Sequence, residues 1–332
     1  MAKAVIVVSN PLSLMNCIEL VYDLGIAFED TAVFFIGKNH NKGKLIQAKK
    51  IIASFPFLQY FIFIRHYPSL NFRQVSLFSR FLRMLFGRVE KRLNWFFVEK
   101  YVKTKTFGYE PELISGSGIY FYPVKRMFKS ASVWIVDSGV SSVRGNIARQ
   151  LSEREKVFSV YDAETLGVPN SLLKRNENKM QIAMCSKLPL HKSVGIFISA
   201  NQAGSRTKSQ WYDRSLLKAR QIHDGKILYY RRANEPIAEA KYICDRHGFD
   251  LVDINWPVEW YLGMELGFLP GRVISVGSSS LKFFSQIPAE KGIEVVFLLP
   301  AEHPRSEKLL ENASVFRKRE SCTGSPVRFV SC

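Results

Sequence analysis

The chain has 332 residues, enough for two domains with full cores, and its 47% hydrophobic and 23% charged residues are ordinary for a globular protein. Its five cysteines are dispersed without Cys-x-x-Cys spacing, which excludes a disulfide framework and a zinc site and favours reduced thiols. The net charge of +18 predicts an anionic partner; since no zinc finger, RNP-type motif or helix-turn-helix is evident, we expect an anionic membrane surface and an anionic substrate rather than nucleic acid.

No segment has the features of a signal peptide or of a membrane-spanning helix. The apolar run Ala4–Val8 is too short for a signal peptide, and no apolar run approaches the about 20 residues that a spanning helix needs. We therefore expect a cytoplasmic protein, or one that is peripheral on the inner face of a membrane.

The first segment predicts a strand followed by a helix. Residues 4–8 are apolar and mostly β-branched, as in a buried parallel strand, and apolar residues recur at helical spacing from Leu12 to Tyr22. Ser9 and Asn10 would lie at the carboxyl end of the strand, where they could cap the helix or contact a ligand. Further on we expect strands at 33–36 and 60–64, with a helix at 42–53 between them.

Residues 71–103 combine an apolar stripe rich in phenylalanine with many arginines and lysines. At helical spacing this pattern indicates a basic amphipathic helix. We favour a domain helix with one buried and one solvated face; the alternative is a helix that lies on an anionic membrane surface.

Two later strands in this half deliver polar turns. A strand at 111–114 leads into the glycine-rich turn of Gly116, Ser117 and Gly118, where the backbone could approach a ligand. A strand at 133–136 delivers Asp137 at its tip. A carboxylate there could act as a general base, or it could cap the following turn.

A polar, proline-flanked stretch at 164–192 divides the chain. We expect a first α/β domain over 1–180, a second over 190–315 and a flexible tail over 318–332. The second domain should have strands at 194–198, 251–254 and 295–299, one through Tyr229 and one at 273–274, and helices at 211–222, 238–247, 259–267, 281–287 and 306–317. Alternating strands and helices in both halves predict an α/β protein with two doubly wound, Rossmann-like domains that face a cleft.

Polar residues follow the apolar runs of the second domain. Paired arginines match the geometry of phosphate, and a Gly-Ser-Ser-Ser turn before a helix offers hydroxyls and backbone N–H groups to an anion. We therefore predict a nucleotide-phosphate site. Its residues are Arg231, Arg232, Glu235, Glu259, Gly277, Ser278, Ser279 and Ser280.

The order of these motifs resembles that of the bacterial sialyltransferases, namely the lipooligosaccharide sialyltransferase and capsule polysialyltransferase families. The matching stretches are 7–16, Asp137-Ser138-Gly139, Tyr229 to Glu235, Pro257 to Glu259, and Ser278 to Ser280. The chain departs from the family pattern twice. One acid stands at Asp137 where the family has two adjacent acids, and Arg232 stands where the family has a histidine.

The resemblance implies the glycosyltransferase B fold and transfer of sialic acid, or a related nonulosonic acid, from its CMP donor to a surface glycan or glycolipid. Asp137 would be the catalytic base and Arg232 would bind the donor phosphate. Ser9, Asn10, Gly116, Ser117 and Gly118 would face the acceptor or the cleft. The domain over 1–180 would then be the acceptor-side domain, and the domain over 190–315 would bind the nucleotide sugar. No histidine pair has metal-ligand spacing, so we expect metal-independent inversion without a cofactor.

Two alternatives stay open. Arg232 in place of histidine is compatible with a transferase that uses another nucleotide-sugar donor. The missing second acid beside Asp137 is compatible with a non-catalytic relative that binds an anionic glycan or a membrane.

Overall fold

The computed structural model describes most of the chain. The described residues are 2–38, 42–65, 95–96, 98–106, 110–118, 121–137, 147, 151–152, 154–199, 210–232, 235–252, 256–278, 280–300, 310, 313 and 327–332. The chain falls into two compact units, one of residues 1–138, 146–159 and 168–174 and the other of residues 139–145, 160–167 and 175–332.

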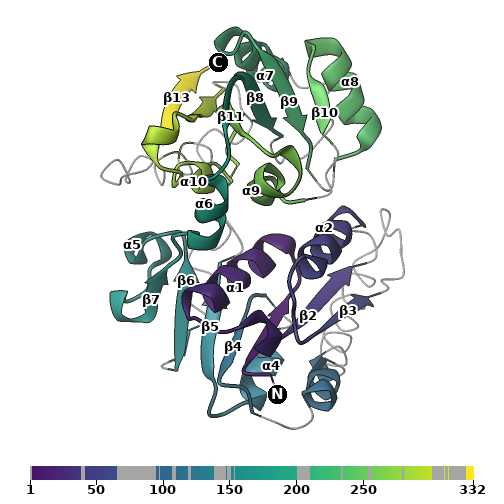
Figure 1. Ribbon diagram of the computed structural model, residues 1–332, viewed down its shortest axis with the longest axis vertical. Coiled ribbons are helices and arrows are strands. Elements are labelled where there is room, and N and C mark those ends of the chain that lie inside the picture. The colour runs from purple at the N-terminus through teal and green to yellow at the C-terminus, as the bar shows by residue number, and fades with distance from the viewer. Residues whose placement is uncertain are drawn as a thin grey trace, which may run out of the picture. The chain divides into compact units, whose positions relative to one another are not determined.

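The first unit is built on a seven-stranded sheet with the order β3-β2-β1-β4-β5-β6-β7 (Figure 1). Its strands are β1 (Ala4–Val8), β2 (Thr31–Lys38), β3 (Gln59–Arg65), β4 (Leu113–Gly116), β5 (Ser132–Val136), β6 (Glu155–Ser159) and β7 (Leu173–Arg175). Neighbouring strands from β3 to β6 pair in parallel. The order runs outward from β1 in both directions, so the topological switch point lies between β1 and β4.

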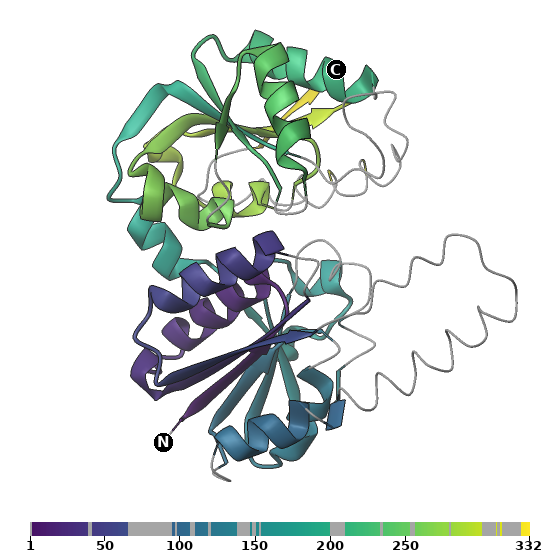
Figure 2. The ribbon, with the colours of Figure 1, turned by 90° about the vertical axis from the view of Figure 1, so that its right-hand side faces the viewer.

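Helices cover both faces of this sheet, which explains why all five residues of β1 are buried. On one face lie α1 (Pro11–Asp23) and α2 (Lys42–Ala53), which contact each other. On the other face lie α4 (Phe121–Met127) and the helical residues 98–105 (Figure 2). The first unit is therefore doubly wound, as predicted.

The second unit has a six-stranded sheet with the order β10-β9-β8-β11-β12-β13, and all its neighbouring pairs are parallel. Its strands are β8 (Leu190–Ile198), β9 (Lys226–Tyr230), β10 (Asp250–Val252), β11 (Leu269–Ser275), β12 (Glu294–Leu299) and β13 (Val327–Ser331). Its helices are α5 (Ala163–Leu166), α6 (Lys179–Cys185), α7 (Gln210–Ile222), α8 (Ile237–His247), α9 (Val258–Tyr261), which continues into a π-helical turn (Leu262–Leu266), and α10 (Leu281–Phe284). The switch point of this sheet lies between β8 and β11.

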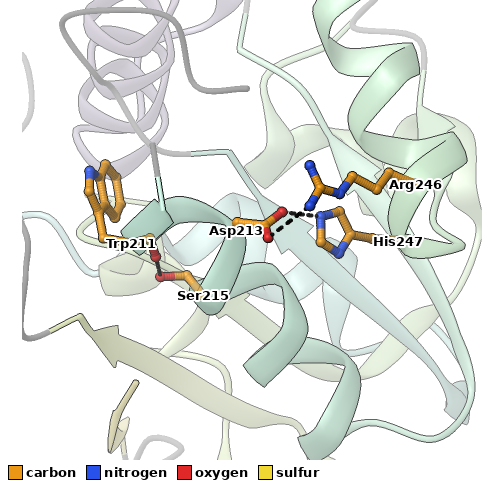
Figure 3. A network of polar contacts seen from close by, with 5 residues as sticks. All are labelled: Trp211, Asp213, Ser215, Arg246 and His247. Carbon is orange, nitrogen blue, oxygen red and sulfur yellow. Dashed lines mark hydrogen bonds and ion pairs between the residues drawn. The ribbon is translucent and has the colours of Figure 1, made fainter. Parts of the chain in front are cut away.

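Helices α7 and α8 are tied together by a carboxylate with two basic partners (Figure 3). Asp213 of α7 lies 2.9 Å from Nε2 of His247 and 3.2 Å from Nη2 of Arg246, both on α8. The His247 side chain is 4% exposed, whereas that of Arg246 is 50% exposed. Because a solvated ion pair contributes little, His247 is the stronger of the two anchors for α8.

The predicted elements agree with the structure where apolar runs are strong, as at β1, β5, β8 and β12. Strands β6 and β7 and helices α5 and α6 were not predicted. Of these, β7, α6 and most of α5 occupy the stretch that we expected to be a polar crossing. The predicted helices at 71–103 and 306–317 lie largely outside the described residues, although 95–96 and 98–105 are helical. Within the described residues no helix is long and apolar enough to cross a membrane.

The prediction of a flexible tail over 318–332 is wrong for its last part. Residues 327–331 form β13, which pairs in parallel with β12. Phe329 packs against Phe297 with ring centroids 5.6 Å apart. Glu294 of β12 accepts hydrogen bonds from Arg272 Nε of β11 at 2.6 Å and from Arg328 Nη1 of β13 at 2.9 Å. An apolar contact and a shared carboxylate thus hold the strand at the edge of the sheet.

We predict that Glu294→Gln destabilises the chain by about 1 kcal/mol at neutral pH, because both arginines lose their ionic partner. Burial alone would raise the pKa of Glu294, but the hydrogen bonds and charges of Arg328 and Arg272 outweigh it and lower that pKa. A carboxyl group with a lowered folded-state pKa stabilises above its unfolded value of about 4.3 and loses that effect as the pH falls through the folded value. Urea unfolding should therefore show a deficit at pH 7 that shrinks towards pH 3, and an equal deficit at both would contradict this account.

Candidate functional site

The carboxyl ends of β1 and β4 bring the predicted acceptor-side residues together at the switch point of the first sheet. Asn10 caps α1 by accepting a hydrogen bond from Ser13 N at 2.8 Å, as one of the two predicted alternatives requires. Ser117 Oγ donates to Ser13 Oγ at 2.6 Å. Ser9 Oγ lies 3.6 Å from the position that a Cβ atom would take at Gly118.

The two glycines of this turn serve different local needs. A Cβ atom at Gly116 would stand 2.1 Å from the carbonyl oxygen of Val7 and 2.5 Å from the ring of Phe121, so packing alone demands glycine there. Gly118 is exposed and has a φ of +81°, a conformation that other residues rarely adopt. Gly118, rather than Gly116, therefore offers open backbone at this edge.

Asp137 follows β5 and is 1% exposed. Nδ2 of Asn16, on α1, lies 3.1 Å from the carbonyl oxygen of Asp137 and 3.2 Å from its Oδ1. The backbone N–H of Asp137 donates to the carbonyl oxygen of Phe158 at 3.3 Å. Main chain and carboxylate are thus both held by neighbouring elements. Ser138 and Gly139 of the same motif lie outside the described residues.

Glu235 is the centre of a buried network in the second unit and is 3% exposed. Its Oε1 accepts a hydrogen bond from the Tyr229 hydroxyl at 2.7 Å, and the Tyr212 hydroxyl lies 2.9 Å from that of Tyr229. Its Oε2 accepts from the Ser199 hydroxyl at 2.6 Å and from the backbone N–H of Arg232 at 3.1 Å. The carboxylate thereby links the ends of β8 and β9.

Both predicted arginines are half-buried and directed by the main chain. Nη1 of Arg231 donates to the carbonyl oxygen of Glu235 at 2.9 Å, and Nε of Arg232 donates to that of Ser199 at 3.1 Å. Carbonyl oxygens are neutral acceptors, and these two hydrogen bonds orient the guanidiniums, which are groups that suit an anionic ligand.

The hydroxyl turn after β11 is compact. Gly277 has a φ of +73°, which favours glycine, and Ser280 N donates to Ser278 Oγ at 3.3 Å. Glu259, in the first turn of α9, is 6% exposed. Burial raises the pKa of Glu259, and a hydrogen bond with the side chain of Ser280 partly offsets this. The structure therefore brings these two predicted motifs together; Ser279 lies outside the described residues.

Three adjacent strands hold these groups side by side. Ser275 Oγ of β11 donates to the carbonyl oxygen of Ile198 at 2.7 Å, and Ser199 N donates to that of Tyr230 at 3.0 Å. The carboxyl ends of β9, β8 and β11 are thus locked together, with cations on one side of β8 and hydroxyls on the other. Such an edge can bind a phosphate group.

Sequence reasoning missed Asn16, Ser199 and Tyr212. Asn16 is a polar residue inside the apolar stripe of α1, and Ser199 directly follows the apolar run of β8. Both positions carried a signal, since a polar side chain at a buried position needs a partner. Tyr212 carried none, because its partner Tyr229 lies 17 residues away on another element.

No cluster of three or more histidine, cysteine, aspartate or glutamate side chains that could hold a metal ion occurs among the described residues.

No protein-family model matches the chain, and no curated protein sequence matches it. Solved structures do match in fold. S. aureus MnaA, solved with UDP, has a TM-score of 0.52 and 9% identity over 96% of this chain and 89% of that chain. A UDP-GlcNAc 2-epimerase from Methanocaldococcus jannaschii, solved with UDP-GlcNAc and UDP, has a TM-score of 0.50 and 11% identity over 98% of this chain and 95% of that chain.

At such identities the likeness concerns the fold alone. It agrees with two parallel-sheet, Rossmann-like domains of the glycosyltransferase B type, the predicted fold class.

Proposed function

We propose that the chain is a glycosyltransferase whose second unit binds a nucleotide-sugar donor. One observation carries the proposal: Arg231 and Arg232 lie beside the end of β8, and the hydroxyl turn of Ser278 and Ser280 follows the neighbouring strand β11. Support also comes from the two similar structures above, which hold UDP or UDP-GlcNAc on the same fold.

Within this class we propose CMP-linked sialic acid, or a related nonulosonic acid, as the donor and a surface glycan or glycolipid as the acceptor. The sialyltransferase-like order of the motifs supports this choice. The alternative is a different nucleotide-sugar donor, which the UDP in the similar structures and the arginine at position 232 favour.

Calorimetric titration with CMP, UDP and GDP separates these possibilities. We expect CMP to bind and CMP-sialic acid to be turned over, and Arg232→Ala to weaken CMP binding by the ~1.5–3 kcal/mol of a charge-assisted contact. Preferential binding of UDP or GDP would favour the other donor. Absence of binding by all three would overturn the proposal and leave a non-catalytic relative.

Asp137 is the proposed general base for the acceptor hydroxyl. Its place at the end of β5 and its fixed orientation beside Asn16 support this role. Asp137→Asn keeps the shape of the side chain and removes its basicity, so donor binding by the second unit should persist while turnover falls by ~10²–10⁴. Near-normal turnover in this variant would remove Asp137 from the mechanism.

We also propose that the chain works at the inner face of an anionic membrane. In the described helical residues 98–105, Tyr101 is 38% exposed and lies between the exposed Lys100 and Lys103, and nearby Phe96 is 58% exposed. Exposed aromatic rings among lysines are typical of membrane-surface helices.

We predict binding to vesicles that contain phosphatidylserine, weakening as salt rises because the Debye length is only ~8 Å at physiological ionic strength. Replacing Lys100 and Lys103 by glutamine should weaken sedimentation with these vesicles. The matched pair Lys187→Gln and Lys241→Gln, which removes two exposed charges from the second unit, should not. If both pairs weaken sedimentation equally, binding depends only on the net charge of the protein and the proposed membrane-surface role of residues 98–105 is wrong.

A further inference from the structure

We propose that Glu235 is the positioning residue of a phosphate clamp formed by Arg231 and Arg232, with Ser199 and Tyr229 completing the device. The inference rests on the proposed function, because it names the residues that prepare the donor site. It assigns Glu235 a role behind the ligand rather than in contact with it.

The first argument is the hydrogen-bond count of Glu235. Its two carboxylate oxygens accept from the hydroxyls of Tyr229 and Ser199 and from the backbone N–H of Arg232, at 2.6–3.1 Å. Its own carbonyl oxygen accepts from Nη1 of Arg231 at 2.9 Å, and its N–H donates to the carbonyl oxygen of Arg232 at 3.0 Å. Glu235 therefore contacts both arginines and is committed to the protein at every polar group.

The second argument is the cost of burial. A carboxylate that is 3% exposed is unfavourable unless several donors replace water. Here they come from three elements, namely Tyr229 at the end of β9, Ser199 just after β8, and the segment that holds Arg232. Burial, followed by the neighbouring Tyr212 and Glu235, raises the pKa of Tyr229, so its hydroxyl keeps its proton and remains a donor. The network is thus complete without a ligand.

The third argument is the charge that remains. The formal charges of Arg231, Arg232 and Glu235 sum to +1. Nε of Arg231 is buried and, among the described residues, has no hydrogen-bond partner. A buried N–H without an acceptor is unfavourable, and a turn of the Arg231 side chain towards a phosphate oxygen would satisfy it. The geometry therefore points to the phosphate of a nucleotide as the group that binds to Arg231 and Arg232.

The test compares nucleotide with nucleoside in wild type and variants. CMP and cytidine, and UDP and uridine, are titrated by calorimetry, with thermal unfolding as a check on folding. Glu235→Ala should weaken nucleotide binding about 10- to 100-fold, the equivalent of one or two charge-assisted contacts, and leave nucleoside binding unchanged. Glu235→Gln retains an acceptor for the Arg232 N–H and should recover most of the loss.

A milder pair of variants guards against misfolding of Glu235→Ala. Tyr229→Phe keeps the ring that stacks on Phe197 and removes only the hydroxyl, so nucleotide affinity should fall about 3- to 10-fold. Tyr242→Phe removes a hydroxyl from a tyrosine that is 51% exposed on α8 and is the matched control.

The outcomes separate the two proposals. If wild type binds no nucleotide, the proposed function fails. If wild type binds nucleotide and the Glu235 and Tyr229 variants bind it equally well, or lose nucleoside in the same proportion, the function stands and the positioning role is overturned.

Discussion

Parallel strand pairing is the constraint on which both units depend. A parallel sheet gathers the carboxyl ends of its strands at one edge, and each sheet here reverses its strand order once, at β1/β4 and at β8/β11. Loops that leave the two strands at such a point turn to opposite faces and leave room for a ligand between them. Every described residue that we place in the site ends a strand or lies in the turn or helix that follows one.

Three buried carboxylates show how the fold fixes these edges in advance. Asp137, Glu235 and Glu259 are 1%, 3% and 6% exposed. Each faces donors supplied by distant parts of the chain, such as the Asn16 amide for Asp137, 121 residues away, and the Ser199 hydroxyl for Glu235. Losing those donors would leave a charge uncompensated in a poorly solvated environment. Folding itself therefore orients the polar groups of both edges, and a ligand meets a prepared arrangement.

The sequence predicted elements whose structure follows from a local pattern of residues. It was less informative for residues whose structure depends on contacts with distant parts of the chain. The apolar runs of β1 and β5 predicted both strands and the polar residues at their tips. In contrast, β13 depends on Glu294, which lies 34 residues before Arg328, and its residues resembled a frayed tail. Gly116 lies between these two cases. The sequence shows a glycine-rich turn, but the reason for glycine is the close approach of Val7 and Phe121, which the sequence does not show. Tyr212 could not be found, because nothing local marks a hydroxyl whose partner is on another element.

The arginine at position 232 implies that different residues stabilise charge and transfer the proton in the proposed reaction. Its Nε donates to the carbonyl oxygen of Ser199, and a guanidinium stays protonated at neutral pH. A histidine at this place could both bind phosphate and transfer a proton, whereas an arginine supplies charge alone. A departing nucleotide phosphate needs that charge more than it needs a proton, because it leaves as an anion. The proton that must move is then the one on the acceptor hydroxyl, and Asp137 is the proposed group to take it. Under this assignment the first unit carries the proton transfer and the second carries the stabilisation of charge.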